Sequence, residues 1–238
     1  MLRIEHFSKS YKGGKKAVDD LNLFVEAGDI YGFIGHNGAG KSTTIKSVAG
    51  VLDFEEGTIT IDGMDIRKDP VACKKRMAYI PDNPDLYEHL TGIQYLNFIG
   101  GIFEVEAAVR KERIQKYGDQ FELTGALGDP VSSYSHGMKQ KLAIISALIH
   151  EPKLMILDEP FVGLDPKATL LLKNTMHEMC RRGAAIFFST HVLDVAEKLC
   201  NKVAIIKGGK LVVSGAMETI LKDASLEHLF MEVTEHEK

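Results

Sequence analysis

The sequence has no run of apolar residues that approaches the roughly 20 needed for a helix to span a bilayer. Its start, Met1 to His6, contains no apolar stretch like the centre of a secretory signal peptide. It also has no excess of positive charge, because 29 basic and 33 acidic residues give a net charge of −4. We therefore expect a cytosolic chain that does not bind nucleic acid and that reaches any membrane through a partner.

Cysteine is scarce as well. The three cysteines, Cys73, Cys180 and Cys200, are odd in number and lack metal-ligand spacing, so we expect small apolar residues in a reducing compartment. Internal repeats and low-complexity tracts are also missing. The 45% apolar and 26% charged residues are ordinary for a folded protein of 238 residues, which is enough for one large domain or two small ones.

Apolar patterning predicts strands towards both ends of the chain and helices between them. From about residue 90 to 148 apolar residues recur at helical spacing, whereas continuously apolar segments in the last third are typical of buried parallel strands. A helix over residues 167–182 would connect two of these strands as a crossover. The predicted strands are residues 2–7, 17–25, 30–34, 57–63, 77–81, 154–157, 185–188 and 203–206.

A phosphate-binding loop is the strongest motif. Residues 35–43 fit the pattern G-x-x-x-x-G-K-[ST] between a predicted strand and a predicted helix, the context in which backbone N–H groups converge on phosphate. The lysine is expected to reach the β- and γ-phosphates and the serine to ligate Mg²⁺. The alternative is a glycine-rich turn that happens to precede a lysine. The residues are Gly35, His36, Asn37, Gly38, Ala39, Gly40, Lys41, Ser42 and Thr43.

Two acids follow the apolar strand at residues 154–157. Asp158 at the strand tip can hold magnesium through water, and Glu159 is placed to orient or deprotonate an attacking water. Two acids that merely cap a strand are the alternative interpretation. The phosphate loop in the same chain favours the functional one.

Residues 135–140, Ser-His-Gly-Met-Lys-Gln, precede an apolar helix over residues 142–149 and by themselves could be an ordinary helix cap. Placed shortly before the acidic strand, they resemble the signature motif of ATP-binding-cassette (ABC) ATPases. The resemblance covers nearly the whole chain, and its motifs occur in family order. They are Tyr11, residues 35–43, Asp82, residues 135–138, Asp158 with Glu159, the D-loop at residues 163–165, and His191.

The resemblance implies a P-loop ATPase core with a mostly parallel sheet, an N-terminal antiparallel β subdomain and an inserted helical subdomain. The single domain over residues 1–238 would comprise a core (1–88 and 151–215), a helical part with the signature (89–150) and a tail (216–238). The ligands implied are ATP and Mg²⁺. The partners implied are a transmembrane permease subunit and a second cassette, so the chain would lie at the cytoplasmic face of the membrane.

The resemblance also implies residue roles. Tyr11 would stack on adenine, although an edge-strand aromatic can also serve packing alone. His191 would bind the γ-phosphate and hold Glu159 and the water, although a lone histidine is more often structural. In a head-to-tail dimer Ser135 and the backbone of Gly137 would cap the γ-phosphate held by the other subunit. Asp165 would cross the same interface.

Several positions depart from the family pattern. Tyr134, His136 and Met138 replace the usual leucine, glycine and glutamine of the signature, while Ser135 and Gly137 remain. We therefore expect activity. If His136 points across the dimer interface, its protonation near pH 6.5 would tune ATP affinity.

The largest departure is Asp82, where the family usually has glutamine. A carboxylate there can still hold a metal-bound water, or it can merely begin a turn. An acid at this position, followed by residues 86–91, and the tail at residues 225–230 resemble exporter-type cassettes of the ABC-2 group. The sequence thus indicates the ATPase of an exporter. An importer ATPase and a mechanical regulator of a membrane partner are the alternatives.

Overall fold

The computed structural model describes residues 1–11, 13–221 and 224–235, and its framework is two β-sheets. The smaller sheet is antiparallel and has four strands in the order β2-β1-β4-β5. Its central pairing puts Leu2 opposite both Val25 and Ile61, and all three side chains are buried. The strands are β1 (Leu2–Ser10), β2 (Lys16–Val25), β4 (Glu56–Ile61) and β5 (Met64–Asp65).

The larger sheet has six strands in the order β10-β9-β3-β8-β7-β6. Only the pair β10–β9 is antiparallel, and the other neighbours run parallel. The register sets Ile34 beside Thr190 and Asp158 beside Ser189, so the carboxyl ends of β3, β7 and β8 meet at one edge. The strands are β3 (Ile30–Ile34), β6 (Met77–Ile80), β7 (Leu154–Asp158), β8 (Ala185–Thr190), β9 (Lys202–Lys207) and β10 (Lys210–Ala216).

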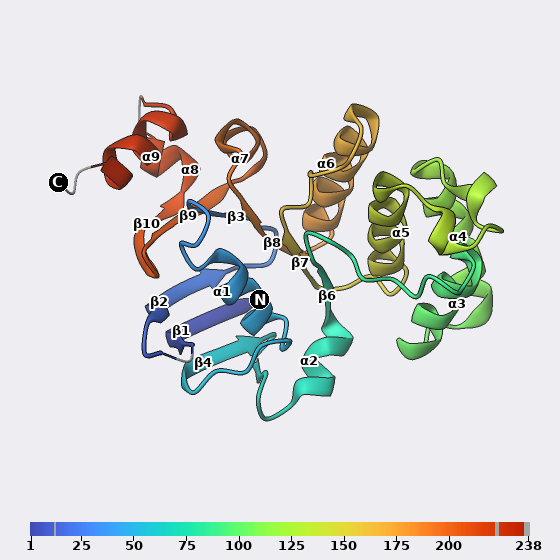
Figure 1. Cartoon of the computed structure of the whole chain (residues 1–238), viewed down its shortest axis with the longest axis horizontal. Coiled ribbons are helices and arrows are strands. Elements are labelled where there is room, and N and C mark those ends of the chain that lie inside the picture. Colours follow the sequence, from blue (N-terminus) through green and yellow to red (C-terminus); the bar gives the residue numbers. More distant parts are fainter. Residues whose placement is uncertain (12, 222–223, 236–238) are drawn as a thin grey trace.

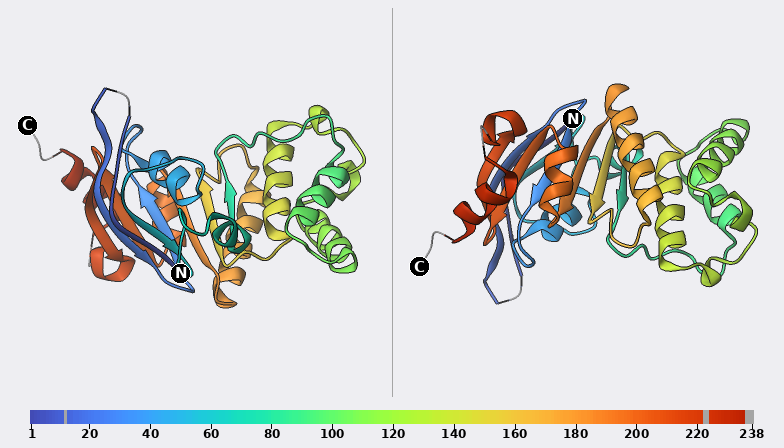
Figure 2. Two further views of the ribbon diagram at one scale, coloured as in Figure 1. Left: turned by 90° about the horizontal axis from the view of Figure 1, so that it is seen from below. Right: turned by 90° about the horizontal axis from the view of Figure 1, so that it is seen from above.

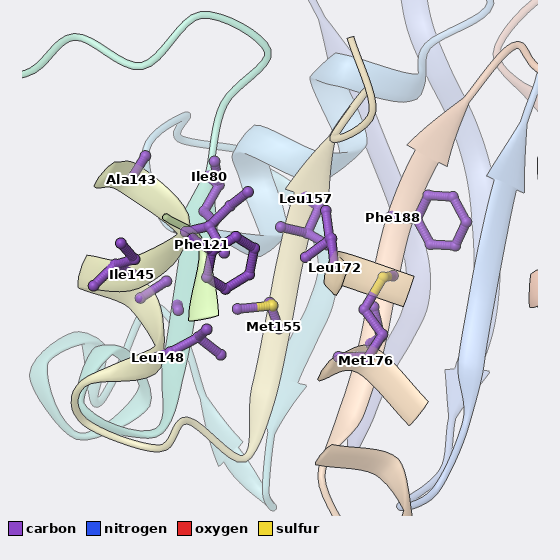
Figure 3. Close-up of a cluster of buried hydrophobic side chains, with 14 of the residues drawn as sticks. Ile80, Phe121, Ala143, Ile145, Leu148, Met155, Leu157, Leu172, Met176 and Phe188 are labelled. Atoms are coloured by element: carbon purple, nitrogen blue, oxygen red, sulfur yellow. The ribbon is translucent and has the colours of Figure 1, made fainter. Parts of the chain in front are cut away.

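Both faces of this sheet are buried, which explains why its central strands lack polar alternation. Met155 and Leu157 of β7 point to the cluster shared with the helices that follow, together with Leu172 and Phe188 (Figure 3). Ile156 of the same strand belongs to the opposite cluster, shared with the antiparallel sheet. Because successive side chains of a strand point to opposite faces of the sheet, alternate residues of β7 belong to two separate hydrophobic cores.

A helical region follows β6 and lies at one end of the molecule (Figures 1 and 2). Its first helix begins with a reciprocal capping box, in which the Thr91 hydroxyl accepts from the backbone of Gln94 and the Gln94 side chain accepts from the backbone of Thr91. The helices are α3 (Gly92–Ile102), α4 (Ala107–Gln120) and α5 (His136–Leu148), with 3₁₀ turns at η1 (Thr124–Ala126) and η2 (Val131–Ser133).

The other helices cover the sheets, and the last two lie at the end of the molecule opposite the helical region (Figure 2). They are α1 (Lys41–Val48), α2 (Pro70–Arg76), α6 (Pro166–Arg181), α7 (Leu193–Leu199), α8 (Met217–Leu221) and α9 (Leu226–Glu235). In the part of the chain that the structure describes, no helix combines the length and apolar character that a bilayer span requires.

The predicted fold class is confirmed, since an antiparallel sheet, a mostly parallel sheet and an inserted helical stretch all occur. The crossover helix predicted over residues 167–182 is α6 (Pro166–Arg181). The sequence did not predict β10, because this edge strand has no fully buried residue and therefore lacks the continuous apolar run of the central strands.

Candidate functional site

The loop of residues 35–40, here called the phosphate loop, connects β3 to α1. Gly40 has φ of +112°, and a Cβ there would lie 2.6 Å from the carbonyl oxygen of Ala17, so only glycine fits. This residue is the N-cap of α1 and leaves the first backbone N–H groups of the helix without an intrahelical partner. A helix start of this kind attracts an anion.

Lys41 is the first residue of α1 and is only 6% exposed. Its Nζ donates to the carbonyl oxygens of Gly35 at 2.7 Å and His36 at 3.3 Å, and lies 3.9 Å from Glu159 Oε1. Burial lowers the pKa of the Lys41 ammonium, while the charges of Glu159 and Asp158 oppose that shift. The amine is thus fixed across the mouth of the loop, beside the two acids.

The next residue joins the loop to the acidic strand. The Ser42 hydroxyl donates to Asp158 Oδ1 at 3.3 Å, and the Ser189 hydroxyl of β8 donates to the same oxygen. Asp158 is 2% exposed, and such burial needs these hydrogen bonds. A hydroxyl and a carboxylate at this distance form the oxygen set that Mg²⁺ prefers. Among the described residues no three His, Cys, Asp or Glu side chains form a metal cluster, so further oxygens would have to come from water or phosphate.

Glu159 and His191 form a pair at the same edge. His191 Nδ1 lies 2.9 Å from Glu159 Oε1, and the backbone N–H of Glu159 donates to Ser189 at 3.2 Å. Glu159 has φ of +48°, a left-handed conformation that is uncommon for a residue with a side chain and often marks functional sites. A carboxylate oriented by a histidine in this way can take a proton from a water molecule.

The predicted adenine-stacking residue lies beside the loop. The Tyr11 hydroxyl is 3.2 Å from Thr43 Oγ1 in α1, and the Tyr11 side chain is 51% exposed. A flat aromatic face beside the helix that follows the phosphate loop is available to a base.

Asp82 is exposed, and its Oδ1 accepts from the backbone N–H of Asn83 at 2.9 Å. This bond joins adjacent residues and leaves the carboxylate open to solvent, so both interpretations of the sequence, a metal-bound water and the start of a turn, stay predictions. The Asp82 charge, like that of Asp158, is close enough to contribute to the raised pKa of the buried Tyr79 hydroxyl, although burial is the larger cause.

The predicted signature residues lie at the start of α5 and contact the D-loop of the same chain. The Ser135 hydroxyl caps the helix by accepting from the backbone of Met138 at 3.3 Å. The ring of His136 packs so closely on Gly163 that a Cβ at Gly163 would lie 2.3 Å from the ring. Gly137 is similarly close to Gly163, because a Cβ added at Gly137 would lie 2.9 Å from the carbonyl oxygen of Gly163.

Asp165 ends the D-loop and caps α6. Its carboxylate accepts from the backbone of Ala168 at 2.7 Å and pairs with Lys141 Nζ of α5 at 2.8 Å. The hydrogen bond from Lys141, and then that from Ala168, lowers the pKa of the Asp165 carboxyl. The signature end of α5 and the D-loop are thus joined within one chain.

A family model described as ABC transporter matches residues 18–162, more than half of the chain. The chain belongs to the ABC transporter ATP-binding family. The ABC-type transporter ATP-binding protein EcsA of Bacillus subtilis is 34% identical over 92% of this chain and 90% of its own length. The ABC transporter ATP-binding protein NatA of the same organism is 31% identical over 97% of each chain. A solved ATP-binding subunit of an ABC transporter superposes with a TM-score of 0.94 at 35% identity, over 98% of this chain and 99% of that one.

The predicted family and the predicted ATPase activity are therefore confirmed: this ABC cassette is an ATP-binding subunit that hydrolyses ATP. Its fold gathers five of the predicted site residues into one connected group. Lys41, Ser42, Asp158, Glu159 and His191 are linked by the contacts above.

Sequence reasoning missed two residues of this cassette. The Ser189 hydroxyl donates to the Asp158 carboxylate, and both the hydroxyl and the backbone carbonyl oxygen of Ser189 accept from the backbone N–H of Glu159. Lys141 holds Asp165. The position of Ser189 opposite Asp158 in neighbouring parallel strands was the available signal for the first. Lys141 had no signal, because its contact joins segments far apart in the sequence.

Proposed function

We propose that this chain is the ATPase subunit of a membrane exporter, in which ATP-dependent pairing of two cassettes moves a separate transmembrane subunit. The observation that carries the nucleotide part is the connected group at one sheet edge, where Lys41 lies 3.9 Å from Glu159 and Glu159 lies 2.9 Å from His191. The membrane part is supported by the ABC transporter ATP-binding proteins that the chain resembles over more than nine-tenths of its length.

In this proposal each residue of the connected group has a different chemical role. Lys41 and the N–H groups at the start of α1 bind the β- and γ-phosphates, which replace Glu159 as the nearest negative charge. Glu159 takes the proton of the attacking water, and His191 holds that carboxylate and donates to the γ-phosphate. Tyr11 stacks on the adenine.

The Ser42 hydroxyl and the Asp158 carboxylate would hold Mg²⁺, because their oxygens are hard ligands and lie 3.3 Å apart. When bound, it would neutralise charge on the phosphate oxygens. The Ser189 hydrogen bond keeps the Asp158 carboxylate oriented for that ion. Asp82 would add a carboxylate oxygen through a bound water, because its side chain is exposed.

The second cassette is proposed because the signature residues do not complete the site of their own chain. In the described residues, the hydrogen bonds and ion pairs of residues 135–141 stay within α5 or go to Glu88 and Asp165, and none reaches the phosphate loop. Ser135 and Gly137 would instead cap the γ-phosphate held by a partner, with Asp165 beside them in the interface.

A groove between the core and the helical region is the proposed docking place of the transmembrane subunit. It has a volume of about 260 Å³ and is lined by Val51, Tyr79, Tyr95, Ile99, Phe103 and His150, among others. Large apolar side chains stay exposed around it, including Val51 (64%) and Ile102 (55%). Tyr87, which is 51% exposed and packs on Phe98 at 5.5 Å, extends this surface from the segment after Asp82.

This position would couple the groove to the nucleotide. Tyr79 lies on β6, three residues before Asp82, and its hydroxyl is a buried group without a hydrogen-bond partner among the described residues. A cytoplasmic helix of the transmembrane subunit that binds in the groove would therefore contact both α3 and β6, the strand next to the one that ends at Asp158. The acid at position 82 and the tail at residues 225–230 support an exporter over an importer.

The test is capture of partners by an ATP-trapped cassette. Tagged Glu159→Gln chain is expressed in its native host and purified in mild detergent with ATP, and bound proteins are identified by mass spectrometry. A stoichiometric multi-span membrane protein is the expected result, after which transport is measured in vesicles with ATP on the cassette side. Export of the substrate supports the proposal, and import overturns the exporter assignment.

A matched pair of variants tests the exposed apolar surface beside the groove, where Phe98 packs on Tyr87. Phe98→Asp should abolish capture of the membrane protein because it places a charge in the apolar surface. Val212→Asp is the control, since Val212 is similarly exposed (42% against 44%) but lies on β10. A soluble partner, or a membrane enzyme without a translocation path, would contradict the proposal and indicate a mechanical regulator.

A further inference from the structure

The C-terminal helix α9 is held to the nucleotide-binding core by one apolar stripe. Leu226 (0% exposed) and Phe230 (6%) are one helical turn apart, and Leu229 and Val233 pack beside them half-buried. Met231 on the other face is 45% exposed. The helix is therefore docked on the core through a single face.

The first turn of α9 is attached to α7. The backbone N–H of Leu226 donates to Glu197 Oε2 at 2.7 Å, and a carboxylate at a helix start is favourable because it meets unpaired N–H groups. Buried Ala196 and Leu199 of α7 belong to the same cluster as Leu226 and Phe230. Since α7 begins two residues after His191, α9 contacts the segment that carries the histidine of the site.

The second turn of α9 reaches the phosphate loop. The ring of Phe230 meets the ring of His36 edge-on, with centroids 4.7 Å apart and planes at 61°. The carbonyl oxygen of His36 accepts from the backbone of Ala39 at 3.1 Å and from Lys41 Nζ at 3.3 Å. The residue that Phe230 holds is thus one of the two whose carbonyls fix the lysine of the site.

We propose that Phe230 is a positioning residue for ATP binding. Through its contacts with His36 and with α7, helix α9 holds the phosphate loop in place relative to the segment that carries His191. Neither Phe230 nor α9 touches the nucleotide. They act on the loop before the ligand arrives. This inference rests on the assignment of residues 35–43 as the phosphate site.

The physical reason is preorganisation. Gly38 and Gly40 give the loop two left-handed positions, and glycine loses more conformational freedom on ordering than any other residue. A side-chain anchor at His36 removes part of that freedom before binding, so less of the phosphate-binding free energy is lost in ordering the loop. Removing the anchor should weaken binding without removing any atom that contacts ATP.

The experiment compares Phe230→Ala with Met231→Ala in the full chain, with a fluorescent ATP analogue and Mg²⁺ as the probe. We expect the Kd of Phe230→Ala to rise about threefold to tenfold, the range of one aromatic contact. The KM for ATP should rise in parallel, and kcat at saturating ATP should change less than twofold. Met231→Ala should leave Kd, KM and kcat unchanged, because that side chain faces solvent.

Two further measurements separate positioning from general destabilisation. Glu197→Ala frees the other end of α9 and should raise Kd in the same direction, while Glu197→Gln keeps an acceptor and should restore it. A cycle of His36→Ala, Phe230→Ala and the double variant should be non-additive, because both single changes remove one contact. If Phe230→Ala does not fold, the Glu197 pair carries the test.

An unchanged Kd in folded Phe230→Ala, or strictly additive effects in the cycle, would overturn the inference. Lys41→Ala distinguishes this outcome from failure of the site assignment. If Lys41→Ala lowers affinity and Phe230→Ala does not, the phosphate site stands and only the role of α9 is wrong. If neither changes affinity, the site itself is misassigned.

Discussion

Two regions that the proposed ATPase cycle uses, the acidic edge of the larger sheet and the signature end of α5, are built differently in this chain. The acidic edge of the sheet, where β7 ends at Asp158 and Glu159, is held by the chain's own contacts, because Asp158 is 2% exposed and accepts hydrogen bonds from hydroxyl groups of two other segments. The signature end of α5 is exposed at His136, and its contacts are with its own helix and the D-loop. Parallel strand register can assemble the first within one chain. The signature end is an exposed surface, and in the proposed function a second cassette packs against it.

The difference also sets what each region can tolerate. At the acidic edge a buried charge depends on a neighbour, so loss of one side chain leaves another unsatisfied. At the signature end Asp165 is half exposed and its ion pair is screened by solvent. Substitutions should therefore have large effects at the first region and small ones at the second, which the following predictions test in descending order.

The largest effect is expected from Glu159→Gln. Loss of the carboxylate that accepts the proton should lower kcat about a hundredfold or more, while ATP affinity stays within about twofold. Steady-state ATPase assays and binding of a fluorescent ATP analogue measure the two quantities. Glu112→Gln, a change at an exposed position of α4, is the control. Near-normal turnover in Glu159→Gln would show that the acidic edge lacks the base we assign to it.

Lys41→Ala should come next. It removes a charged hydrogen-bond donor from the phosphates, a loss of about 1.5–3 kcal/mol, so affinity for ATP should fall about tenfold to hundredfold. Lys46→Ala changes an exposed lysine on the same helix and should bind normally. Equal affinities of the two variants would contradict the assignment of the loop.

His150 tests how the helical region is fastened to the core. Its ring stacks on Phe103 at 3.7 Å and lies 3.2 Å from the Met77 carbonyl oxygen, and burial lowers the His150 pKa to about 4. In the unfolded chain the His150 ring takes up a proton near pH 6.5, whereas in the folded chain it does so only near pH 4. The stability that the neutral ring contributes is therefore fully present above pH 6.5 and is lost as the pH falls towards 4. From pH 7 to pH 5 the free energy of unfolding should drop by about 2 kcal/mol through this group.

Urea unfolding at the two pH values measures this drop. His150→Gln should reduce it, whereas His177→Gln should not, because His177 is exposed. An unchanged pH dependence in His150→Gln would show that the imidazole is not held neutral between the helical region and β6.

The smallest effect is expected at the signature end. Lys141→Met keeps the apolar stem but frees Asp165, and loss of a solvent-exposed ion pair should change an equilibrium by less than about fivefold. In the Glu159→Gln background the ATP-dependent dimer, followed by size-exclusion chromatography, should weaken by that factor. Lys139→Met, which breaks the neighbouring pair with Glu88, is the matched control. A loss of nucleotide affinity in isolated monomers would blur the distinction between the two regions.

Much of the acidic edge could be predicted because its residues follow strands that apolar patterning identifies. Asp158 and Glu159 end β7, and His191 follows β8, so parallel pairing brings them together. Asp82 shows where this reasoning stopped. Its place after β6 suggested either a magnesium ligand or the start of a turn, and its exposed carboxylate accepts only from the neighbouring Asn83 N–H among the described residues, so strand register does not choose between the two.

His136 teaches the same limit at the other region. The sequence left open where this ring lies, and the structure packs it on Gly163 of the same chain. That contact depends on how α5 and the D-loop approach one another. No local pattern encodes this distance, although the glycine at 163 is the residue that permits it.

The family, the α/β class and the elements that carry the nucleotide motifs follow from local properties of the chain, namely glycine spacing, charged strand ends and apolar periodicity. Three contacts appear only in the folded chain. Ser189 contacts the Asp158 carboxylate and the Glu159 backbone, Lys141 pairs with Asp165, and Phe230 of the last helix packs on His36. These contacts join segments distant along the chain, and packing of whole elements, with no periodic signal of its own, fixes them.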